Sequence, residues 1–276
     1  MRKGLAQVTR HDLRRALRRY QKAGLADSTI QRRAATLRSF YDFLFAMGLI
    51  KSRPTANLQL PKGWERVPRA PAAEDLERVI AAVGREAPLD LRDRAILLLL
   101  RDSGLRAMAL SRICVSAIDW EHARITIRED KYGKQHVVPV SQRALEALYD
   151  YVEKARPLFL KGRDVPYLFP GVVVPYRCGR RSRAGGDHLC RVHIYNIAKR
   201  WTRKVLGQSY SPHKWRAACF TEAAAQEMDN FDLMNLAGHS SPETTERYIR
   251  HQTAHLKERY YATHPRAGKK PSHDAK

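Results

Sequence analysis

The sequence predicts a mainly helical protein with a small antiparallel β-sheet, an α+β fold in two domains. Apolar residues recur at helical spacing along most of the 276 residues, and two short β-rich runs, "ARITIRED" and "QHVVPVS", are joined through "KYGK". Between the two predicted domains lies a proline-rich stretch without periodicity. A chain of this length can bury a small helical core and a second, larger one.

The composition is strongly basic. Lys and Arg number 51 against 28 Asp and Glu, which gives a formal net charge of +23. So much uncompensated charge implies a polyanionic partner, and nucleic acid is the first candidate. The longest apolar run, "AILLLL" at residues 95–100, is too short to span a bilayer, and no secretory signal follows Met1. We expect a soluble cytoplasmic protein, associated with the nucleoid, whose cysteines are thiols.

Residues 1–50 predict a short domain of two helices. The first begins with Thr9 and Asp12 in a capping-box arrangement and ends at Gly24, and the second ends at Gly48. Basic residues fill the face opposite the apolar one, and few carboxylates are near enough to pair with them. We therefore expect these residues to contact the DNA backbone: Arg14, Arg15, Arg18, Arg19, Lys22, Arg32, Arg33 and Arg38.

Residues 51–71 predict a basic interdomain linker. Four prolines lie between Pro54 and Pro71, and the stretch is long enough to pass around a duplex, so that the two domains clamp DNA from opposite sides. Residues 72–265 then form the larger domain, and the tail at 266–276 is expected to be disordered.

The larger domain is predicted to be helical around one β-hairpin. The segments "AAEDLERVIAAV" and "LDLRDRAILLLLRDSG" have helical spacing, and the second is apolar enough to be largely buried. The two β-rich runs follow, with Gly133 in the tight turn between them. Further helices are expected at about residues 141–155, 190–205, 212–226, 231–236 and 242–249, with a last helical segment to 261.

One group of residues has side chains that often bind metals. Cys178, His188, Cys190 and His193 have the spacing C-x9-H-x-C-x2-H, which lacks the paired knuckles of common zinc modules. Unpaired loop residues are the favoured interpretation, and no metal site is predicted.

Two arginines and a histidine stand out in the larger domain. Arg106 in "SGLRAMAL" follows a glycine-containing break after the buried helix, where its side chain can leave the core. In "SPHKWRAACF", His213 and Arg216 are three residues apart and share one helix face. Guanidinium groups match phosphate oxygens bidentately, so two of them from separate helices are suited to clamp one phosphodiester.

Three further residues complete a candidate site for phosphodiester chemistry. Lys131 at the tip of the hairpin adds a cation. In "LAGHSSPETTERYIRH", His239 adds a group that titrates near neutral pH, and Tyr248 adds a phenol that becomes a nucleophile when activated. Each residue alone has an ordinary structural explanation, but the joint pattern favours a catalytic site.

With these residues, the chain resembles the tyrosine recombinases of the phage integrase and Xer family from about Arg69 to His264. The resemblance implies a short helical DNA-clamping domain followed by an integrase-type catalytic domain. The hairpin lysine of the family matches Lys131, and Lys134, the less favoured candidate, is expected to contact DNA. The remaining motifs match Gly104-Leu105-Arg106, His213 to Arg216, and Gly238-His239 with Tyr248 nine residues after His239.

The resemblance implies a site-specific recombinase that uses no metal, ATP or other cofactor. Arg106 and Arg216 would hold the scissile phosphate, with a hydrogen bond from His239. Tyr248 would attack in line and form a 3′-phosphotyrosyl link, which conserves the energy of the phosphodiester.

The remaining roles follow from the same resemblance. His213 would assist proton transfer at the nucleophile, and Lys131 would protonate the leaving 5′-oxygen. Strand exchange through a Holliday junction would need a homotetramer on two DNA sites, with a helix at about residues 251–261 docked on a neighbouring protomer. An accessory or activating protein is a further expected partner.

Three positions depart from the family pattern. Ala109 stands where the family commonly has Glu, while Lys214 and Ala217 replace an acid and a second His in the "HDLRH" box. The sequence also predicts only two helices in the N-terminal domain, whereas related recombinases usually have about four there. Two alternatives therefore stay open: a type IB topoisomerase-like enzyme that uses the same residues, and a catalytically silent DNA-binding relative. A metal-dependent nuclease is disfavoured because carboxylates are scarce near the basic motifs.

Overall fold

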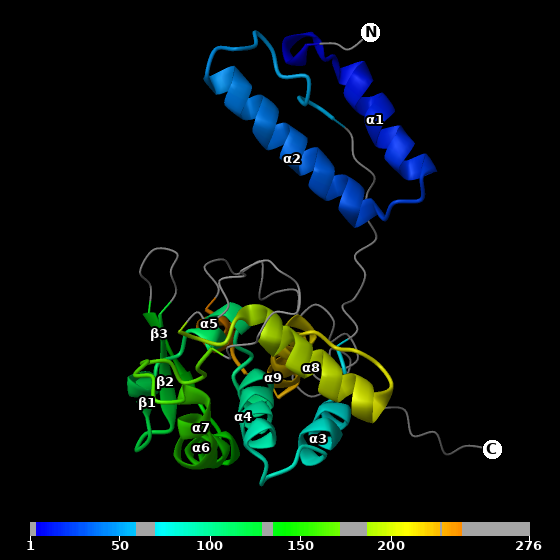
Figure 1. Ribbon diagram of the computed structural model, residues 1–276. Helices are drawn as coiled ribbons and strands as arrows, with labels where there is room; N and C mark the ends of the chain where they lie inside the picture. The colour runs from blue at the N-terminus through cyan, green and yellow to red at the C-terminus, as the bar shows by residue number, and fades with distance from the viewer. Residues whose placement is uncertain (1–3, 59–69, 129–134, 172–186, 227, 239–276) are drawn as a thin grey trace, which may run out of the picture. The chain divides into compact units, whose positions relative to one another are not determined.

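The computed structural model describes residues 4–58, 70–128, 135–171, 187–226 and 228–238. Within these ranges the chain is mainly helical with one three-stranded antiparallel sheet, which confirms the predicted fold class. It divides into two compact units, Met1–Val67 and Pro68–Lys276, drawn in Figure 1. Several predicted features lie outside the described residues: most of the linker, Cys178, Lys131, Lys134, His239, Tyr248 and the helices expected after residue 242.

In the first unit, α1 (Arg10–Lys22) and α2 (Asp27–Ala46) pack against each other after a 3-10 turn at Leu5–Gln7. The capping box is confirmed, because Asp12 N donates to Thr9 Oγ1 (3.3 Å) while Thr9 N donates to Asp12 Oδ2 (2.9 Å). One apolar face of each helix is buried, and its residues are Leu13 and Leu17 on α1 and Ile30, Ala34, Tyr41 and Leu44 on α2.

Residues 51–58 lie against this helical core, although the sequence predicts a linker from residue 51. Thr55 and Leu58 are 1% and 4% exposed, and Arg38 Nη2 donates to the carbonyl of Leu58 at 3.4 Å. The segment, which contains Pro54, is irregular as expected, but irregular backbone can still bury an apolar side chain. Leu58 therefore fastens the segment to the helices.

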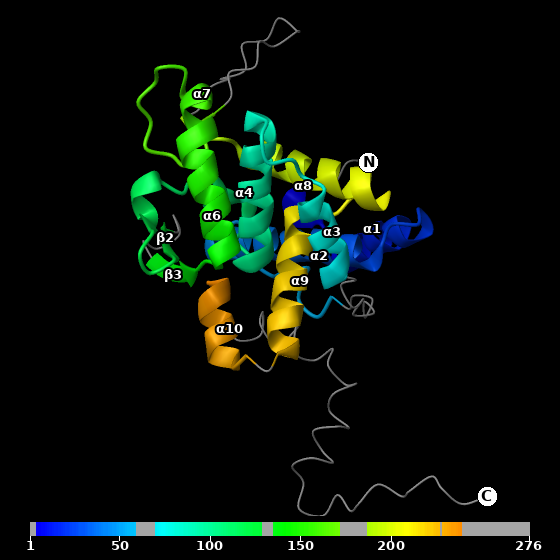
Figure 2. The same ribbon diagram turned by 90° about the horizontal axis from the view of Figure 1, so that it is seen from below.

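In the second unit, α4 (Pro88–Asp102) is the central helix. Every residue from Leu91 to Leu100 is buried, and from Ala95 to Leu100 all the side chains are apolar. The charged residues of this run are buried with partners, since Arg92 pairs with Asp93 and Arg94 donates to the carbonyl of Ile80. Around it pack α3 (Ala73–Ala81), α6 (Gln142–Asp150), α8 (Arg191–Leu206) and α9 (Pro212–Ala225). Figure 2 shows α4 between α6 and α9.

The sheet consists of β1 (Ile118–Asp119), β2 (Arg124–Arg128) and β3 (Gln135–Pro139), in that order. The predicted hairpin is confirmed, since Ile125 pairs with Val138 and Ile127 with His136 in an antiparallel register. Ile125, Ile127 and Val138 are buried, as expected for alternating side chains on one face of a sheet. The third strand, β1, is too short to leave a periodic pattern in the sequence.

The helix expected at residues 141–155 is interrupted. After α6, a π-helical turn at Tyr151–Ala155 leads into the short α7 (Arg156–Leu160). Pro157 has no N–H to donate to the preceding turn, which gives a local reason for the irregular hydrogen bonding. Tyr151 remains fully buried, with its ring centroid 5.0 Å from that of Phe169.

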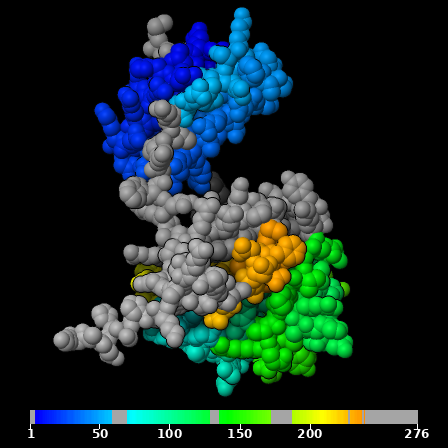
Figure 3. Space-filling view, turned by 180° about the vertical axis from the view of Figure 1, so that it is seen from behind, coloured from blue at the N-terminus to red at the C-terminus, as the bar shows by residue number. Residues whose placement is uncertain are grey.

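Glycines end two of the last three described helices, α8 and α10 (Asn230–Ala237). Gly207 follows α8 with φ +70°, and Gly238 follows α10 with φ +58°, both in the left-handed conformation that favours glycine. α10 packs against α9 and β3 and reaches the surface in Figure 3. Among the helices of the described residues, none is long and apolar enough to cross a membrane.

Candidate active site

The turn after α4 turns Arg106 outward while its neighbour Leu105 stays in the core. Gly104 adopts φ +57°, a conformation that side chains rarely allow, and the chain reverses there. Leu105 is 2% exposed, whereas Arg106 is exposed and forms the N-cap of the short helix α5 (Ala107–Ser111). The break that the sequence predicts after the buried helix therefore presents Arg106 at the surface.

α9 supplies the histidine and the second arginine. Ser211 is its N-cap and Pro212 its first residue, so His213 and Arg216 lie in the first turns of the helix. Arg216 is 4% exposed, and its Nη1 donates to the carbonyl oxygen of Gly104 at 2.6 Å. This hydrogen bond joins α9 to the turn that carries Arg106.

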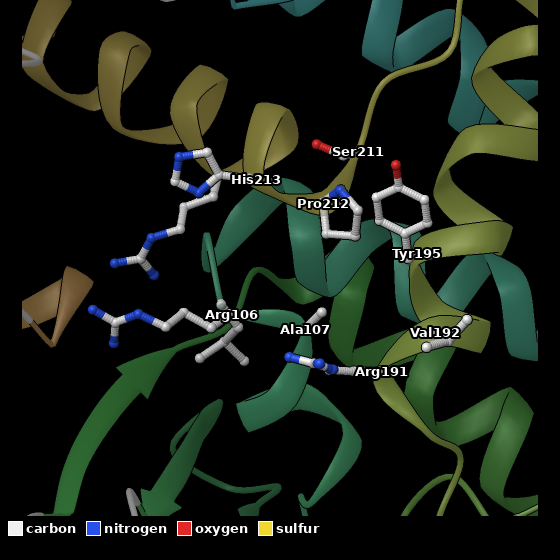
Figure 4. A pocket seen from close by; sticks show the side chains of 10 residues that line it. Arg106, Ala107, Arg191, Val192, Tyr195, Ser211, Pro212 and His213 are labelled. Atoms are coloured by element: carbon white, nitrogen blue, oxygen red, sulfur yellow. The ribbon is translucent and has the colours of Figure 1, made fainter. Parts of the chain in front are cut away.

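Arg106, His213 and Arg216 line one pocket of about 500 Å³. Its other lining residues are Leu105, Ala107, Arg191, Val192, Tyr195, Ser211 and Pro212. Figure 4 shows Arg106 and His213 extending from separate elements, with Arg191, Val192 and Tyr195 of α8 on the other side. The volume lies in the range of ligand-binding pockets, so the site has room for more than a phosphate group.

The environment of His213 favours its neutral form. Although the ring reaches the surface, surrounding protein desolvates it, and the charges of Arg216, Lys214 and Arg106 act in the same direction. Together these causes lower the pKa of His213 below its ordinary value of 6.5. A neutral imidazole beside two guanidinium groups can accept a proton while the cations bind an anion.

Lys131, Lys134, His239 and Tyr248 lie outside the described residues. The elements that lead to them are described. β2 ends at Arg128 and β3 begins at Gln135, on either side of the two lysines, and α10 ends immediately before Gly238 and His239.

The three described residues of the zinc candidate group, His188, Cys190 and His193, make different contacts. Cys190 Sγ lies 3.1 Å from His193 Nδ1 at the start of α8, whereas His188 packs edge-on against the ring of Tyr167, with centroids 5.0 Å apart. Across the described part of the chain, no group of three or more His, Cys, Asp or Glu residues is placed to hold a metal ion.

The contribution of α8 to the pocket was not predicted from the sequence. Arg191 and Tyr195 line it, and Lys199 Nζ lies 5.1 Å from the centroid of the Tyr195 ring. The signal was present in the sequence, because Arg191, Tyr195, Lys199 and Arg203 recur every four residues and therefore share one face of α8. Basic side chains interleaved with an aromatic ring are typical of surfaces that bind nucleic acids.

The basic residues of the first unit lie on exposed surfaces of α1 and α2. Two of them have additional contacts: Arg33 Cζ lies 4.2 Å from the centroid of the Tyr20 ring, and Arg38 binds the carbonyl of Leu58. The exposed members of the predicted set are Arg14, Arg15, Arg18, Arg19, Lys22, Arg32, Arg33 and Arg38.

Comparison with known proteins identifies the class of this fold and site. Residues 72–255 match the Phage integrase family, and residues 1–48 match the Phage integrase, N-terminal SAM-like domain. The tyrosine recombinase XerC of Xanthomonas campestris pv. campestris (strain B100) is 31% identical over 96% of this chain and 77% of its own length. XerC of Haemophilus influenzae (strain PittEE) is 30% identical over 96% of this chain and 84% of its own length.

Solved structures share the fold. XerH site-specific recombinase, bound to a palindromic difH substrate, has a TM-score of 0.73 at 17% identity, covering 94% of this chain and 73% of its own. A lambda integrase dimer bound to a COC′ core site has a TM-score of 0.65 at 18% identity, covering 90% and 82%. The chain belongs to the phage integrase family. It is a site-specific tyrosine recombinase, an enzyme that cleaves and rejoins DNA strands.

Proposed function

We propose that this recombinase cleaves DNA by attack of Tyr248 on a phosphodiester held by Arg106 and Arg216. The observation that carries the proposal is the shared pocket of Arg106, His213 and Arg216, which come from two segments far apart in the sequence. The fold of α4, α5 and α9 supports it, because the Gly104 carbonyl links the two arginine-bearing segments. Two permanently charged guanidinium groups at one site are suited to bind a phosphate whose negative charge increases in the transition state.

The proposed reaction proceeds in balanced steps. The Tyr248 phenol gives up its proton, with help from His213, and its oxygen attacks phosphorus as the bond to the 5′-oxygen breaks. Lys131 delivers a proton to that leaving oxygen, which gives a free 5′-hydroxyl and a 3′-phosphotyrosyl link. His239 donates a hydrogen bond to a non-bridging oxygen. Attack by a 5′-hydroxyl of the partner duplex then reverses the chemistry and exchanges strands through a Holliday junction.

Three surfaces are proposed to hold the DNA. The arginines of α1 and α2 contact backbone phosphates from one unit, Lys134 contacts them from the hairpin, and the basic stripe of α8 continues from the active-site pocket. Supporting this proposal, the basic side chains of α1 and α2 and those of Arg191 and Arg203 on α8 are exposed, Lys199 is half-buried, and carboxylates that would neutralise them are few.

The proposed assembly is a homotetramer on two DNA sites, with the segment at about residues 251–261 docked on a neighbouring protomer and an accessory protein as activator. The lambda integrase neighbour is a dimer on its core site, and the XerH neighbour is bound to a palindromic substrate. Binding of related proteins to such DNA sites supports an assembly in which two protomers occupy each site. Action on such sites would place the protein at the nucleoid.

The experiment uses nicked suicide duplexes drawn from DNA flanking the gene and from a random pool. Wild type and Tyr248→Phe are incubated with each duplex in EDTA, and SDS-resistant, protease-sensitive adducts are measured. We expect adducts with the wild type alone, while both proteins bind the duplexes with similar affinity. Adducts that persist in Tyr248→Phe would mean that another residue is the nucleophile.

The same experiment separates the alternative functions. Tight binding without adducts in the wild type would favour a catalytically silent DNA-binding relative, as the substitutions at Ala109, Lys214 and Ala217 suggest. Adducts accompanied by relaxation of supercoiled DNA, without exchange between two labelled duplexes, would favour a topoisomerase-like enzyme.

A further inference from the structure

Phe220 lies directly beneath the guanidinium group of Arg216. The two residues are one helical turn apart on α9, and Arg216 Cζ lies 4.6 Å from the centroid of the Phe220 ring. Both side chains are buried, with exposures of 4% for Arg216 and 1% for Phe220. A cation near the face of an aromatic ring is attracted by the quadrupole of the ring, and the attraction is strongest where water is excluded.

The same ring also packs against the turn that carries Arg106. A Cβ atom on Gly104 would lie 2.9 Å from Phe220 Cζ, closer than real side-chain contacts allow, and 3.2 Å from Cε1, which is tighter than most. Glycine at this position thus lets the turn approach the ring, and its carbonyl oxygen then accepts the 2.6 Å hydrogen bond from Arg216. One ring therefore contacts both arginine-bearing segments of the pocket.

Two alanines near these arginines make such support important. Ala109 lies in α5, the helix capped by Arg106, and Ala217 directly follows Arg216. A methyl group offers neither a hydrogen bond nor a charge to orient a guanidinium fork. The orientation of Arg216 must therefore come from other groups, and the Gly104 carbonyl and the Phe220 ring are two that the structure provides.

We infer that Phe220 is a positioning residue for the cleavage reaction, which holds Arg216 toward the scissile phosphate through the face of its ring and fixes the distance to the Arg106 turn. This inference rests on the proposed role of Arg216. Phe220 itself does not touch the DNA; it acts through the guanidinium group. A preorganised fork stabilises the transition state because it needs no reorganisation when negative charge develops.

The test separates this role from ordinary packing by changing the electron density of the ring. Phe220→Leu removes the aromatic face, and 3,5-difluorophenylalanine at position 220 weakens it while nearly keeping its shape. The matched control is Phe169→Leu, which removes another fully buried ring of the same unit, one that packs on Tyr151. Thermal unfolding and DNA affinity are measured for every variant.

The decisive readout is the rate of adduct formation on two suicide duplexes. One has an ordinary scissile phosphate, and the other has a methylphosphonate there, which lacks the negative charge that Arg216 neutralises. We expect Phe220→Leu to cleave the phosphate about tenfold more slowly, and the difluoro variant to lie between it and wild type. On the methylphosphonate, the loss of rate in each Phe220 variant should shrink to about twofold or less. Phe169→Leu, compared at equal concentrations of folded protein, should cleave both duplexes at the same rate as wild type.

Each outcome decides one claim. Equal losses on the two duplexes, or full activity of the fluorinated protein, would show that Phe220 only fills space, and the inference would fall. If Phe220→Leu does not fold, the fluorinated variant alone decides. Absence of adducts with the wild type would instead overturn the proposed function and leave the contact between Phe220 and Arg216 unaffected.

Discussion

At the scale of single residues, the environment of His213 leads to a pH prediction. Desolvation and the charges of Arg216, Lys214 and Arg106 lower its pKa below 6.5, so the neutral ring predominates at higher pH. If neutral His213 accepts the proton of the nucleophile, cleavage is fast above this lowered pKa and slows as the pH falls through it. We therefore expect the acidic limb of the cleavage-rate profile to have its midpoint below pH 6.5.

Removal of a positive charge next to the His213 ring tests whether neighbouring cations lower its pKa. Lys214→Gln removes one of the cations that lower the pKa of His213, so the midpoint of the acidic limb should move to higher pH, toward 6.5. Lys154→Gln removes an exposed lysine that is paired with Asp150, and it should leave the profile in place. A limb that stays fixed in Lys214→Gln, or that survives in His213→Ala, would assign the titration to another group.

At the scale of secondary-structure elements, Asp93 joins α4 to α8. Its carboxylate is fully buried, accepts a hydrogen bond from Trp201 Nε1 at 2.8 Å, and pairs with Arg92 and Arg200. This contact holds the helix whose N-terminal residues line the candidate active-site pocket. Asp93→Ala leaves the buried guanidinium of Arg92 and the buried N–H of Trp201 without their partner, so we expect the free energy of unfolding to fall by about 3–5 kcal/mol.

Denaturant unfolding followed by tryptophan fluorescence measures this loss. Trp120, Trp201 and Trp215 all belong to the second unit and report its unfolding. The control is Asp75→Ala, which breaks an exposed pair with Arg78 and should cost about 1 kcal/mol or less. A loss for Asp93→Ala no larger than that of the control would mean that the buried network does not fasten α8.

At the scale of the whole molecule, the net charge of +23 makes DNA binding sensitive to salt. Each basic residue that contacts a phosphate releases condensed counterions, so the logarithm of affinity falls with the logarithm of salt concentration by about 0.9 per contact. Replacing Arg14, Arg15 and Arg18 by Gln should therefore reduce this slope by about 2–3. The measurement is a titration of fluorescent duplex DNA at several salt concentrations.

A matched triple variant controls for total charge. Arg78, Arg124 and Lys154 each pair with an Asp residue in the second unit, and their replacement by Gln removes the same formal charge. We expect the slope of this control to stay near that of the wild type. Equal slopes for the two triple variants would mean that α1 makes no phosphate contacts and that only the total charge matters.

Much of the fold could be predicted because its signals are local. The Thr9 capping box, the apolar face of α1, the buried α4 and the β2–β3 hairpin all follow from patterns a few residues long. The exceptions required longer-range information. The short strand β1 and the anchor at Leu58 depend on neighbours that a periodic pattern does not reveal.

For the candidate site too, some features follow from the local sequence and others depend on tertiary contacts. The sequence by itself determined the residue types and motifs, including the arginines at positions 106 and 216, the histidine at 213 and their membership of a recombinase pattern. Only the tertiary structure decided that these residues share a pocket with α8, and that Arg216 contacts the Gly104 carbonyl and the Phe220 ring. The physical reason is that spacing along a helix is set by its geometry, whereas contact between distant segments is set by packing of the whole core.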